Sequence, residues 1–340
     1  MSEIAIIGAG AWGTGLAIVL GRKGTHRIRL WAYEADVCDA IEQKRVNERF
    51  LPGCAVPDVV TATNDIVAAL DGAQVVVSVM PSQYCRGLFE RMAPLISSQA
   101  LIVSATKGLE QGSLQRMTEV IAAEFRRKGG SVPPLGALSG PSFAQEVARG
   151  DPTAVTIASG TVTLARTVQQ EFSDPSFRIY TNNDVIGVEL GGALKNIVAI
   201  AAGICHGLGL GHNSVAALIT RGLAEMTRLV TACGGRAETM AGLAGLGDLV
   251  LTCTGGLSRN RNVGVELGRG HKLPEILAGM HGMVAEGIFT TAAAVGLAQT
   301  RGVEMPITEQ MHAILHQGKS PREAIRELMA RSGKSETSSR

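Results

Sequence analysis

Two patterns of hydrophobic and polar positions divide the chain. Up to about residue 184, short apolar runs of strand length alternate with amphipathic segments of helix length, whereas later the helical period dominates and clear strand runs disappear. This order predicts a doubly wound parallel sheet with right-handed crossovers, followed by an all-helical region. The expected strands are 4–8, 28–33, 75–82, 101–108, 135–142 and 154–158, and the expected helices between them are 14–22, 39–49, 64–70, 83–94 and 113–127.

The second region predicts a separate helical domain that begins near Asp184. The end of the chain, RSGKSETSSR, is small and polar, which is typical of a disordered tail. The predicted organisation is therefore an α/β domain over 1–184, a helical domain over 185–330 and a tail over 331–340. The expected helices of the second domain are 184–206, 213–233, 236–243, 259–269, 286–300, 308–317 and 321–330.

A charged side chain, that of Lys195, lies in the middle of the apolar helical run GVELGGALKNIVAIAAG at 187–203. An amine removed from water costs free energy unless it finds partners or loses its proton. Taken alone, the helix is equally compatible with a lysine that reaches solvent through its long stem and with one held ready for proton transfer. In the second case desolvation would lower the pKa of Lys195, which suits general acid chemistry.

Composition restricts the class of protein. At 340 residues with 45% hydrophobic residues, the chain has ample material for two cores. A net charge of +2 gives no field that would favour nucleic acid or an anionic membrane surface as a partner.

The six cysteines show no C-x-x-C spacing, so no metal site is expected, and scattered thiols suit a reducing cytosol. The N-terminus does not have the pattern of a signal peptide, and an apolar run of spanning length is interrupted by Lys195 and Asn196. We therefore expect a soluble cytoplasmic protein without an integral membrane segment.

A glycine pattern follows the first strand. Gly8, Gly10 and Gly13 spell G-x-G-x-x-G and open a helix, which is the context that makes this pattern typical of dinucleotide binding. Gly8 permits the tight turn, Gly10 lets the backbone approach a pyrophosphate, and Gly13 allows the helix to pack closely on the strand. The first domain is therefore predicted to be a dinucleotide-binding Rossmann domain.

The end of the second strand bears on the choice of cofactor. Glu34 lies about where such folds bind the hydroxyls of the adenosine ribose, which favours NAD over NADP. Arg22, Lys23, Arg27 and Arg29 are near in sequence, and any that turned inward could accept a 2′-phosphate. Glu34 could also simply begin the following helix, where a carboxylate favours the helix dipole. The expected cofactor is NAD or NADP.

Two further segments carry candidate chemistry. Asp248 lies in the apolar run GLAGLGDLVLTC, where a pairing with Lys195 would solve both burial problems, although it could instead cap a helix. The segment SRNRN at 258–262 places arginines and asparagines at the start of a helix, which is a natural anion site. One of Arg259 and Arg261 is expected to be only a solvated charge.

With these motifs together, the chain closely resembles the NAD(P)-dependent glycerol-3-phosphate dehydrogenases of the bacterial form, which reduce dihydroxyacetone phosphate for phospholipid synthesis. The resemblance implies a Rossmann domain joined to a helical substrate domain, with the active site in the cleft between them. Apolar helices in the C-terminal half make a homodimer a reasonable expectation. The matching segments are GAGAWGTGLA at 8–17, ATKGLE at 105–110, SGPSFAQEVARG at 139–150, GVELGGALKNIVAIAAG at 187–203, TRGLAEM at 220–226, GLGDLVLTC at 245–253, SRNRNVG at 258–264 and VEMPIT at 303–308.

The resemblance also implies roles for individual residues. Lys195 would be the general acid in reduction and the base in the reverse direction, with Asp248 as its partner, and Lys107 would touch both substrate and cofactor. Trp12 would cover the pyrophosphate or nicotinamide side. The other residues implied for substrate are Gly140, Ser142, Ser258, Arg259 and Asn260, with Arg259 and Asn260 on the phosphate, and the others implied for the cofactor are Ala144, Val284, Glu286 and Arg259.

Two positions depart from the family pattern. Ala11 stands where many relatives carry a serine or threonine, so the backbone must make that contact to the pyrophosphate. Ala32 and Tyr33 stand where a histidine or arginine is often found, which weakens an inference of NADPH preference.

Two other functions fit parts of the sequence. A reductase of another small oxo acid could use the same two-domain plan, with the arginine binding a carboxylate. A non-catalytic redox sensor could bind the dinucleotide and signal to a partner, although sensing alone needs no proton donor such as Lys195.

Overall fold

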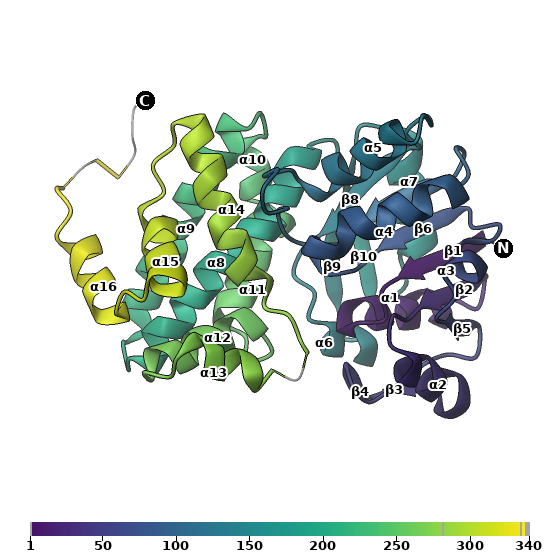
Figure 1. The fold of residues 1–340 in the computed structure, drawn as a ribbon, viewed down its shortest axis with the longest axis horizontal. Coiled ribbons are helices and arrows are strands. Elements are labelled where there is room, and N and C mark those ends of the chain that lie inside the picture. Colours follow the sequence, from purple (N-terminus) through teal and green to yellow (C-terminus); the bar gives the residue numbers. More distant parts are fainter. Residues whose placement is uncertain (1, 281, 334, 337–340) are drawn as a thin grey trace.

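The computed structural model describes residues 2–280, 282–333, 335 and 336, and they form two units. Figure 1 shows the sheet unit on the right and the helical unit on the left. The last strand ends at Asn182 and the first long helix of the helical unit begins at Val185, which supports a domain division at residue 184 as a proposal. The tail predicted over 331–340 includes residues 334 and 337–340, which lie outside the described residues.

The sheet has eight strands in the order β10-β9-β8-β7-β6-β1-β2-β5. Neighbouring strands are parallel except β8 and β9, which are antiparallel, so the predicted parallel sheet contains one antiparallel pair that the sequence did not indicate. Hydrophobic pattern does not encode strand direction, and the chain reverses after β8 through residues 140–152 without crossing the sheet. The strands are β1 (Ser2–Ile7), β2 (His26–Trp31), β5 (Val60–Thr63), β6 (Val75–Ser78), β7 (Leu101–Ser104), β8 (Leu135–Ser139), β9 (Thr153–Ser159) and β10 (Phe177–Asn182).

The sequence did not predict the two edge strands, β5 and β10. Both alternate buried and exposed residues, because an edge strand is covered less completely than a central one and lacks a continuous apolar run. A small antiparallel hairpin of β3 (Val46–Asn47) and β4 (Leu51–Ala55) was also missed. The helix predicted at 39–49 is instead α2 (Ala35–Lys44), because the chain leaves the helix at Arg45, whose φ of 56° is left-handed.

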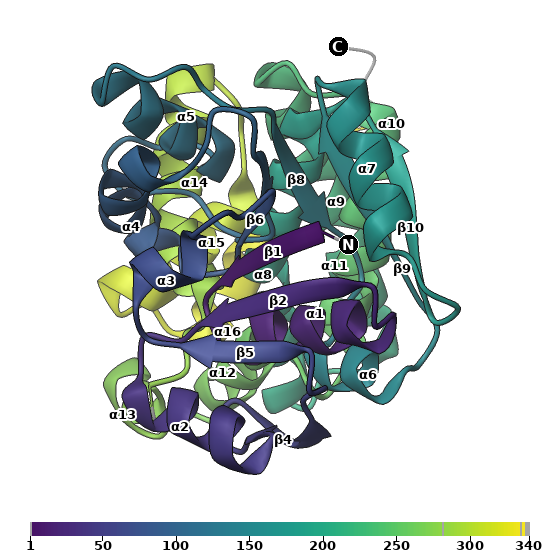
Figure 2. The same ribbon diagram turned by 90° about the vertical axis from the view of Figure 1, so that its right-hand side faces the viewer.

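Helices cover both faces of the sheet, as Figure 2 shows from the side. Ile4 and Ile6 of β1 belong to the core on the side of α1, α2 and α7, whereas Ala5 and Ile7 belong to the core on the side of α3, α4 and α5. This alternation is the geometry of a doubly wound sheet, as predicted. The helices of this unit are α1 (Ala11–Arg22), α2, α3 (Ile66–Leu70), α4 (Cys85–Met92), α5 (Met117–Arg127), α6 (Ala144–Arg149) and α7 (Val162–Phe172), with short 3₁₀ turns η1 (Ser82–Tyr84) and η2 (Ala93–Leu95).

The helical unit is built around α8 (Val185–Gly207), which is buried from Gly187 to Cys205. The prediction missed α11 and α13 and made one helix of 236–243, where α10 ends at Met240 and a π-helix follows. The remaining elements are α9 (His212–Ala232), α10 (Ala237–Met240), the π-helix η3 (Leu243–Gly247), α11 (Asp248–Thr254), α12 (Arg259–Gly268), α13 (Leu273–Ala278), α14 (Glu286–Arg301), α15 (Pro306–Gln317) and α16 (Pro321–Met329).

By length and composition, α8 is the one single helix in the described ranges that could cross a membrane, and a bent pair formed by 237–254 and 259–268 passes the same test when taken together. However, 89% of the apolar window of α8 is buried inside the fold. Such burial is typical of the core helix of a globular protein.

Glycines bring the backbones of α8 and α12 into direct contact. A Cβ on Gly264 would lie 2.0 Å from the carbonyl oxygen of Ile200, and a Cβ on Gly203 would lie 2.0 Å from the carbonyl oxygen of Arg261. No side chain fits between these backbones, so α12 is held directly against the helix that carries Lys195.

We therefore expect Gly264→Ala to destabilise the protein by about 1–3 kcal/mol, because the added methyl group must displace backbone in a packed core. Urea denaturation followed by circular dichroism measures the change. Gly87→Ala is the matched control, since Gly87 is an exposed helical glycine with no atom within 4 Å of a built Cβ. The control should be neutral or stabilising by up to about 1 kcal/mol. Equal effects of the two substitutions would contradict the close helix contact.

Candidate active site

A buried carboxylate between two lysines lies where the two units meet. Asp248 Oδ2 accepts a hydrogen bond from Lys107 Nζ at 2.6 Å, and Asp248 Oδ1 lies 2.9 Å from Lys195 Nζ. Asp248 is 1% exposed and Lys195 is 6% exposed, so both charges are almost completely removed from water. The structure thus shows the predicted pairing of Asp248 with Lys195, and it adds Lys107 as a second ammonium partner of Asp248.

The electrostatics of this group follow from burial and proximity. The pKa of Lys195 is lowered to about 8, mainly by desolvation. The negative charge of Asp248 opposes this shift, and the positive charge of Lys107 adds to it. Burial alone would raise the pKa of Asp248, but the two lysines outweigh it and lower that pKa. Asp248 is therefore a carboxylate at neutral pH, and Lys195 titrates within reach of physiological pH.

Three different elements supply these side chains. Lys107 follows β7 at the carboxyl end of the sheet, Lys195 lies in the middle of α8, and Asp248 is the first residue of α11, directly after the π-helix η3. The Gly140 carbonyl, which follows β8, also accepts a hydrogen bond from Lys107 Nζ at 3.1 Å and one from Ser142 Oγ at 2.9 Å. Gly140 has a φ of +144°, and a Cβ there would lie 2.9 Å from the Cα of Val155. Only glycine fits this turn without strain.

Sequence reasoning missed two neutral residues of this cluster. Thr252 Oγ1 accepts a hydrogen bond from Lys195 Nζ at 2.6 Å and donates to the carbonyl oxygen of Asp248 at 2.6 Å, four residues before it on α11. Asn196, next to Lys195, accepts a hydrogen bond at its Oδ1 from Asn260 Nδ2 at 2.9 Å. Buried polar groups in proteins are hydrogen-bonded, but neither residue carries a charge, so the apolar runs at 187–203 and 243–253 gave no clear sign of their role.

The start of α12 approaches the same cluster. Ser258 caps this helix by accepting a hydrogen bond from the Arg261 backbone N–H at 3.2 Å, and Asn260 joins Asn196 on α8 to the Gly287 N–H on α14, which lies 2.9 Å from its Oδ1. Arg259 keeps solvent-exposed surface, although desolvation by the surrounding protein lowers its pKa against the opposing charge of Glu286. The helix start and the guanidinium together form an electropositive surface beside Lys195.

A second contact between the units involves Glu286, the first residue of α14. Its carboxylate accepts hydrogen bonds from the Ser82 backbone N–H at 2.9 Å and from Ser82 Oγ at 2.6 Å. Burial raises the pKa of Glu286, while Ser82 and Arg259 act in the opposite direction. Gly108 fits beneath this contact, because a Cβ on it would lie 2.6 Å from Ser82 Oγ. The turn after β6 is thus held by α14, and Gly108, the residue after Lys107, lies close against this contact.

The glycine-rich turn fits a dinucleotide. A Cβ on Gly13 would lie 1.8 Å from the Gly8 carbonyl oxygen, so α1 packs directly on the turn, whereas a Cβ on Gly10 would meet no atom within 4 Å. Among the described residues no side chain caps α1, whose first turn also lacks acidic residues. The N–H groups in the first turn of α1 are therefore left without a side-chain cap, which suits the binding of a pyrophosphate.

Other residues predicted for the cofactor lie around this turn. Ala32 is fully buried, Tyr33 is 78% exposed, and Glu34 stands at the N-cap of α2 without a side-chain cap hydrogen bond. Trp12 lies against Phe177, with the ring centroids 6.4 Å apart. Ala144 begins α6, and its Cβ would lie 3.6 Å from a Cβ on Gly15 of α1, while half-buried Val284 lies in the loop before α14.

The structure therefore forms two groups of predicted residues. Lys107, Gly140, Ser142, Lys195 and Asp248 are joined by hydrogen bonds, with Asn196 leading from Lys195 to the start of α12. The second group surrounds the glycine-rich turn at the carboxyl end of β1, and Ala32, Tyr33 and Glu34 follow the neighbouring strand β2. In α/β sheets, ligands bind at these carboxyl ends.

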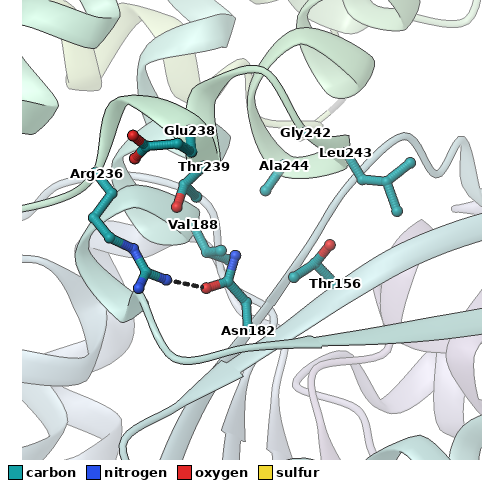
Figure 3. A pocket seen from close by; sticks show the side chains of 9 residues that line it. All are labelled: Thr156, Asn182, Val188, Arg236, Glu238, Thr239, Gly242, Leu243 and Ala244. Atoms are coloured by element: carbon teal, nitrogen blue, oxygen red, sulfur yellow. Dashed lines mark hydrogen bonds between the residues drawn. The ribbon is translucent and has the colours of Figure 1, made fainter.

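A separate pocket of about 500 Å³ lies on another side of the junction. Figure 3 shows its lining side chains and the hydrogen bond from Arg236 to Asn182, which measures 2.9 Å. Neither lysine of the buried cluster belongs to its lining, so the pocket is distinct from the candidate site. Its lining residues are Thr156, Asn182, Val188, Arg236, Glu238, Thr239, Gly242, Leu243 and Ala244.

Comparison with known proteins covers both units. Residues 3–165 match the family model described as NAD-dependent glycerol-3-phosphate dehydrogenase N-terminus, and residues 184–326 match the model of the corresponding C-terminus. The chain is 67% identical over 331 residues to the glycerol-3-phosphate dehydrogenase (NAD(P)+) of Koribacter versatilis, covering 97% of this chain and 98% of that protein. It is 56% identical over 339 residues to the protein of the same name from Acidobacterium capsulatum, covering 99% and 100%.

A solved structure agrees with this likeness. The crystal structure of glycerol-3-phosphate dehydrogenase from Coxiella burnetii superposes with a TM-score of 0.92 at 46% sequence identity, covering 97% of this chain and 99% of that chain. The family resemblance and the fold class predicted from the sequence are both confirmed.

The charges around Lys195 generate a prediction. Because Asp248 raises the pKa of Lys195, Asp248→Asn should move the titration midpoint of Lys195 below its wild-type value of about 8. An NMR titration of protein with ¹³C-labelled lysine side chains measures the midpoint, with the signal assigned by comparison with Lys195→Met. Asp65→Asn is the control, since Asp65 caps α3 through the Val67 N–H and an asparagine caps equally well. A midpoint that stays unchanged or rises in Asp248→Asn would show that the carboxylate does not control this amine.

Proposed function

The chain belongs to the NAD-dependent glycerol-3-phosphate dehydrogenase family, and from that membership we propose that it interconverts dihydroxyacetone phosphate and sn-glycerol 3-phosphate with NAD or NADP. The observation that carries this function in the structure is the buried Asp248 carboxylate with both lysines on it, beside the electropositive start of α12. When bound, the nicotinamide donates a hydride to the carbonyl carbon or accepts it in the reverse direction.

Lys195 is our proposed proton donor. Reduction of a ketone requires a proton at the carbonyl oxygen as the hydride reaches the carbon, and oxidation of the alcohol requires a base at the same place. A lysine whose pKa is about 8 can do both, since the ammonium form dominates below that pH and the neutral amine above it. Asp248 and Thr252 hold the Nζ atom in place by contacts of 2.9 Å and 2.6 Å.

Lys107 complements this role. Its ammonium group touches Asp248 and the Gly140 carbonyl, and it retains some exposure, with 18% of the side chain accessible to solvent. We propose that this exposed part faces both substrate and cofactor, where its charge stabilises the oxyanion that develops on the carbonyl oxygen. Gly140 and Ser142 would line the substrate on the sheet side.

The phosphate of the substrate would bind at the start of α12. The helix N-terminus, the Arg259 guanidinium and the Ser258 hydroxyl offer N–H and O–H donors to a dianion. Asn260 already uses its Oδ1 and one Nδ2 hydrogen within the protein, which leaves one N–H for a ligand. This engagement fixes the side chain before substrate arrives.

The cofactor would lie along the glycine-rich turn, with its pyrophosphate at the N-terminus of α1. Gly8, Gly10, Ala11, Trp12 and Gly13 belong to this turn and the first turn of α1. The remaining proposed contacts come from the strand and helix ends nearby, which are Ala32, Tyr33, Glu34, Lys107, Ala144, Arg259, Val284 and Glu286. A carboxylate at Glu34 disfavours a 2′-phosphate, so the ratio of kcat/KM for NADH and NADPH measures its influence.

The cellular setting belongs to the same proposal. All six cysteines are free thiols, and α8 is buried inside the fold. Both features suit a cytoplasmic enzyme that supplies glycerol phosphate for glycerophospholipid synthesis. Partly exposed apolar residues on the helical unit, such as Leu210 and Phe289, suit a homodimer.

The experiment that tests this function compares wild type with Lys195→Met in an assay of NADH and NADPH oxidation with dihydroxyacetone phosphate. We expect Lys195→Met to lower kcat by roughly 10²- to 10⁴-fold, the usual effect of losing a general acid, while cofactor affinity changes by only a few-fold. Cofactor fluorescence measures that affinity. If the wild-type enzyme turns over an unphosphorylated oxo acid but not dihydroxyacetone phosphate, the proposed substrate is wrong. If kcat stays near normal in Lys195→Met, Lys195 is not the proton donor.

The phosphate site gives a separate prediction. Arg259→Ala should raise KM for dihydroxyacetone phosphate by roughly 10- to 100-fold, because a charge-assisted contact to the phosphate is lost. Steady-state kinetics with dihydroxyacetone, which has no phosphate, should show no such difference between variant and wild type. Arg261→Ala is the matched control and should change KM by less than about twofold, since only its backbone N–H takes part in the helix cap. The reverse order of effects would assign the phosphate to Arg261.

A further inference from the structure

A segment of the sheet unit is packed inside the helical unit. Residues 107–118, which run from Lys107 to the first turn of α5, are called the 107–118 segment here. Leu109 in this segment is fully buried in the core formed by α8, α9 and α14. Leu114, with a φ of 61°, packs on Gly296 of α14, where a built Cβ would lie 3.2 Å from Leu114 Cδ2. The segment that begins with Lys107 therefore depends on the helical unit for its position.

A buried carboxylate on α8 holds the other end of this segment. Glu189 Oε2 accepts hydrogen bonds from Arg116 Nη1 at 2.5 Å and from Thr118 Oγ1 at 2.5 Å, and Glu189 Oε1 accepts one from the Thr118 backbone N–H at 2.8 Å. The side chains of Glu189 and Arg116 are 6% and 14% exposed. A buried, charge-assisted contact of this kind fixes the positions of both side chains, because neither can exchange its partner for water.

The two ends of the segment are coupled. Leu109 and Arg116 form an isolated β-bridge, and the Glu110 N–H donates to the Gln115 carbonyl oxygen at 3.0 Å, so the segment is closed on itself. A displacement of Arg116 is therefore transmitted to Leu109, two residues from Lys107. On the other side, Glu189 lies fewer than two helical turns before Lys195 on the same rigid helix.

We propose that Glu189 is a positioning residue for the reaction, which sets the placement of Lys107 relative to Lys195 by fixing the 107–118 segment to α8. The residue does not touch the lysines and acts through Arg116 and Thr118. This inference rests on the proposed function, in which Lys195 transfers the proton and Lys107 stands beside it.

The proposal has an electrostatic consequence. Lys107 lowers the pKa of Lys195, whereas Asp248 raises it, and both lysines share the Asp248 carboxylate. If the 107–118 segment moves away, Lys195 loses a repelling charge and gains a larger share of the carboxylate, so its pKa must rise. A further titratable group that influences Lys195 is Cys253 on α11, whose own pKa burial raises to about 12, and it stays a neutral thiol through this pH range.

Glu189→Gln is the test substitution. Its amide oxygen can still accept from the Thr118 N–H, which favours folding, but it carries no charge for Arg116. Relative to wild type we expect kcat for dihydroxyacetone phosphate to fall about tenfold or more, as for a misplaced catalytic group, and the titration midpoint of Lys195 to rise above about 8. Glu189→Asp keeps the charge with a shorter reach and should shift the midpoint in the same direction by less, so it also serves if the glutamine variant does not fold.

The matched control is Glu119→Gln. Glu119 is the other carboxylate on Arg116, 2.8 Å from Nη2, but it lies on α5 in the same unit, with 46% of its side chain exposed. It should leave kcat within about twofold and the midpoint unchanged.

The NMR titration of Lys195 in the complete protein needs no substrate, so it tests the positioning even if dihydroxyacetone phosphate is not turned over. An unchanged midpoint in folded Glu189→Gln, or an equal shift in Glu119→Gln, would overturn the proposal. A fall in kcat that merely follows a lowered melting temperature, with the midpoint unchanged, would show that Glu189 has only a structural role.

Discussion

The contact of one buried carboxylate with two ammonium groups is the interaction on which the site depends. Asp248 could not remain ionised at 1% exposure without Lys107 and Lys195, since a lone buried charge costs several kcal/mol. Neither lysine could be brought as deep without the carboxylate. The three groups together keep one net positive charge, and the start of α12 adds a partial positive charge beside them. A surface of this kind favours a small anion over a neutral molecule, which agrees with a phosphorylated substrate.

Backbone geometry places these charges more than side-chain packing does. Gly203 and Gly264 let α8 and α12 touch, and the π-helix η3 ends at Gly247, so that Asp248 begins α11 and its carboxylate turns towards α8. A π-helical turn inserted before a functional residue is a common way to redirect a side chain. On the sheet side, Gly140 occupies a left-handed conformation that brings its carbonyl to Lys107. The charged cluster is therefore positioned by rigid elements from both units.

Charge and glycine were informative in the sequence, and neutral polarity was not. The pairing of Lys195 with Asp248 could be predicted because each is an ionisable residue in an apolar run. The G-x-G-x-x-G pattern likewise predicted dinucleotide binding. Thr252 gave no such signal, since a threonine is unremarkable in a buried helix. The Ser82 contact with Glu286 joins residues 204 positions apart, and no local pattern encodes a contact of that range. The direction of β9 could not be predicted either, because the hydrophobic pattern of a strand is the same for parallel and antiparallel pairing.

Three contacts across the junction share one feature: each joins a loop at the carboxyl end of the sheet to the helical unit. Lys107 meets Asp248, Arg116 meets Glu189, and Ser82 meets Glu286. Neither unit alone holds the complete site, because Lys195, the proposed proton donor, lies on α8 and one of the charges that sets its pKa lies after β7. The pKa of Lys195 is consequently a function of how the units are held together, as well as of its own burial. A ligand that contacts both units would hold Lys107 on Asp248 and so stabilise the arrangement in which Lys195 can both give and take a proton near neutral pH.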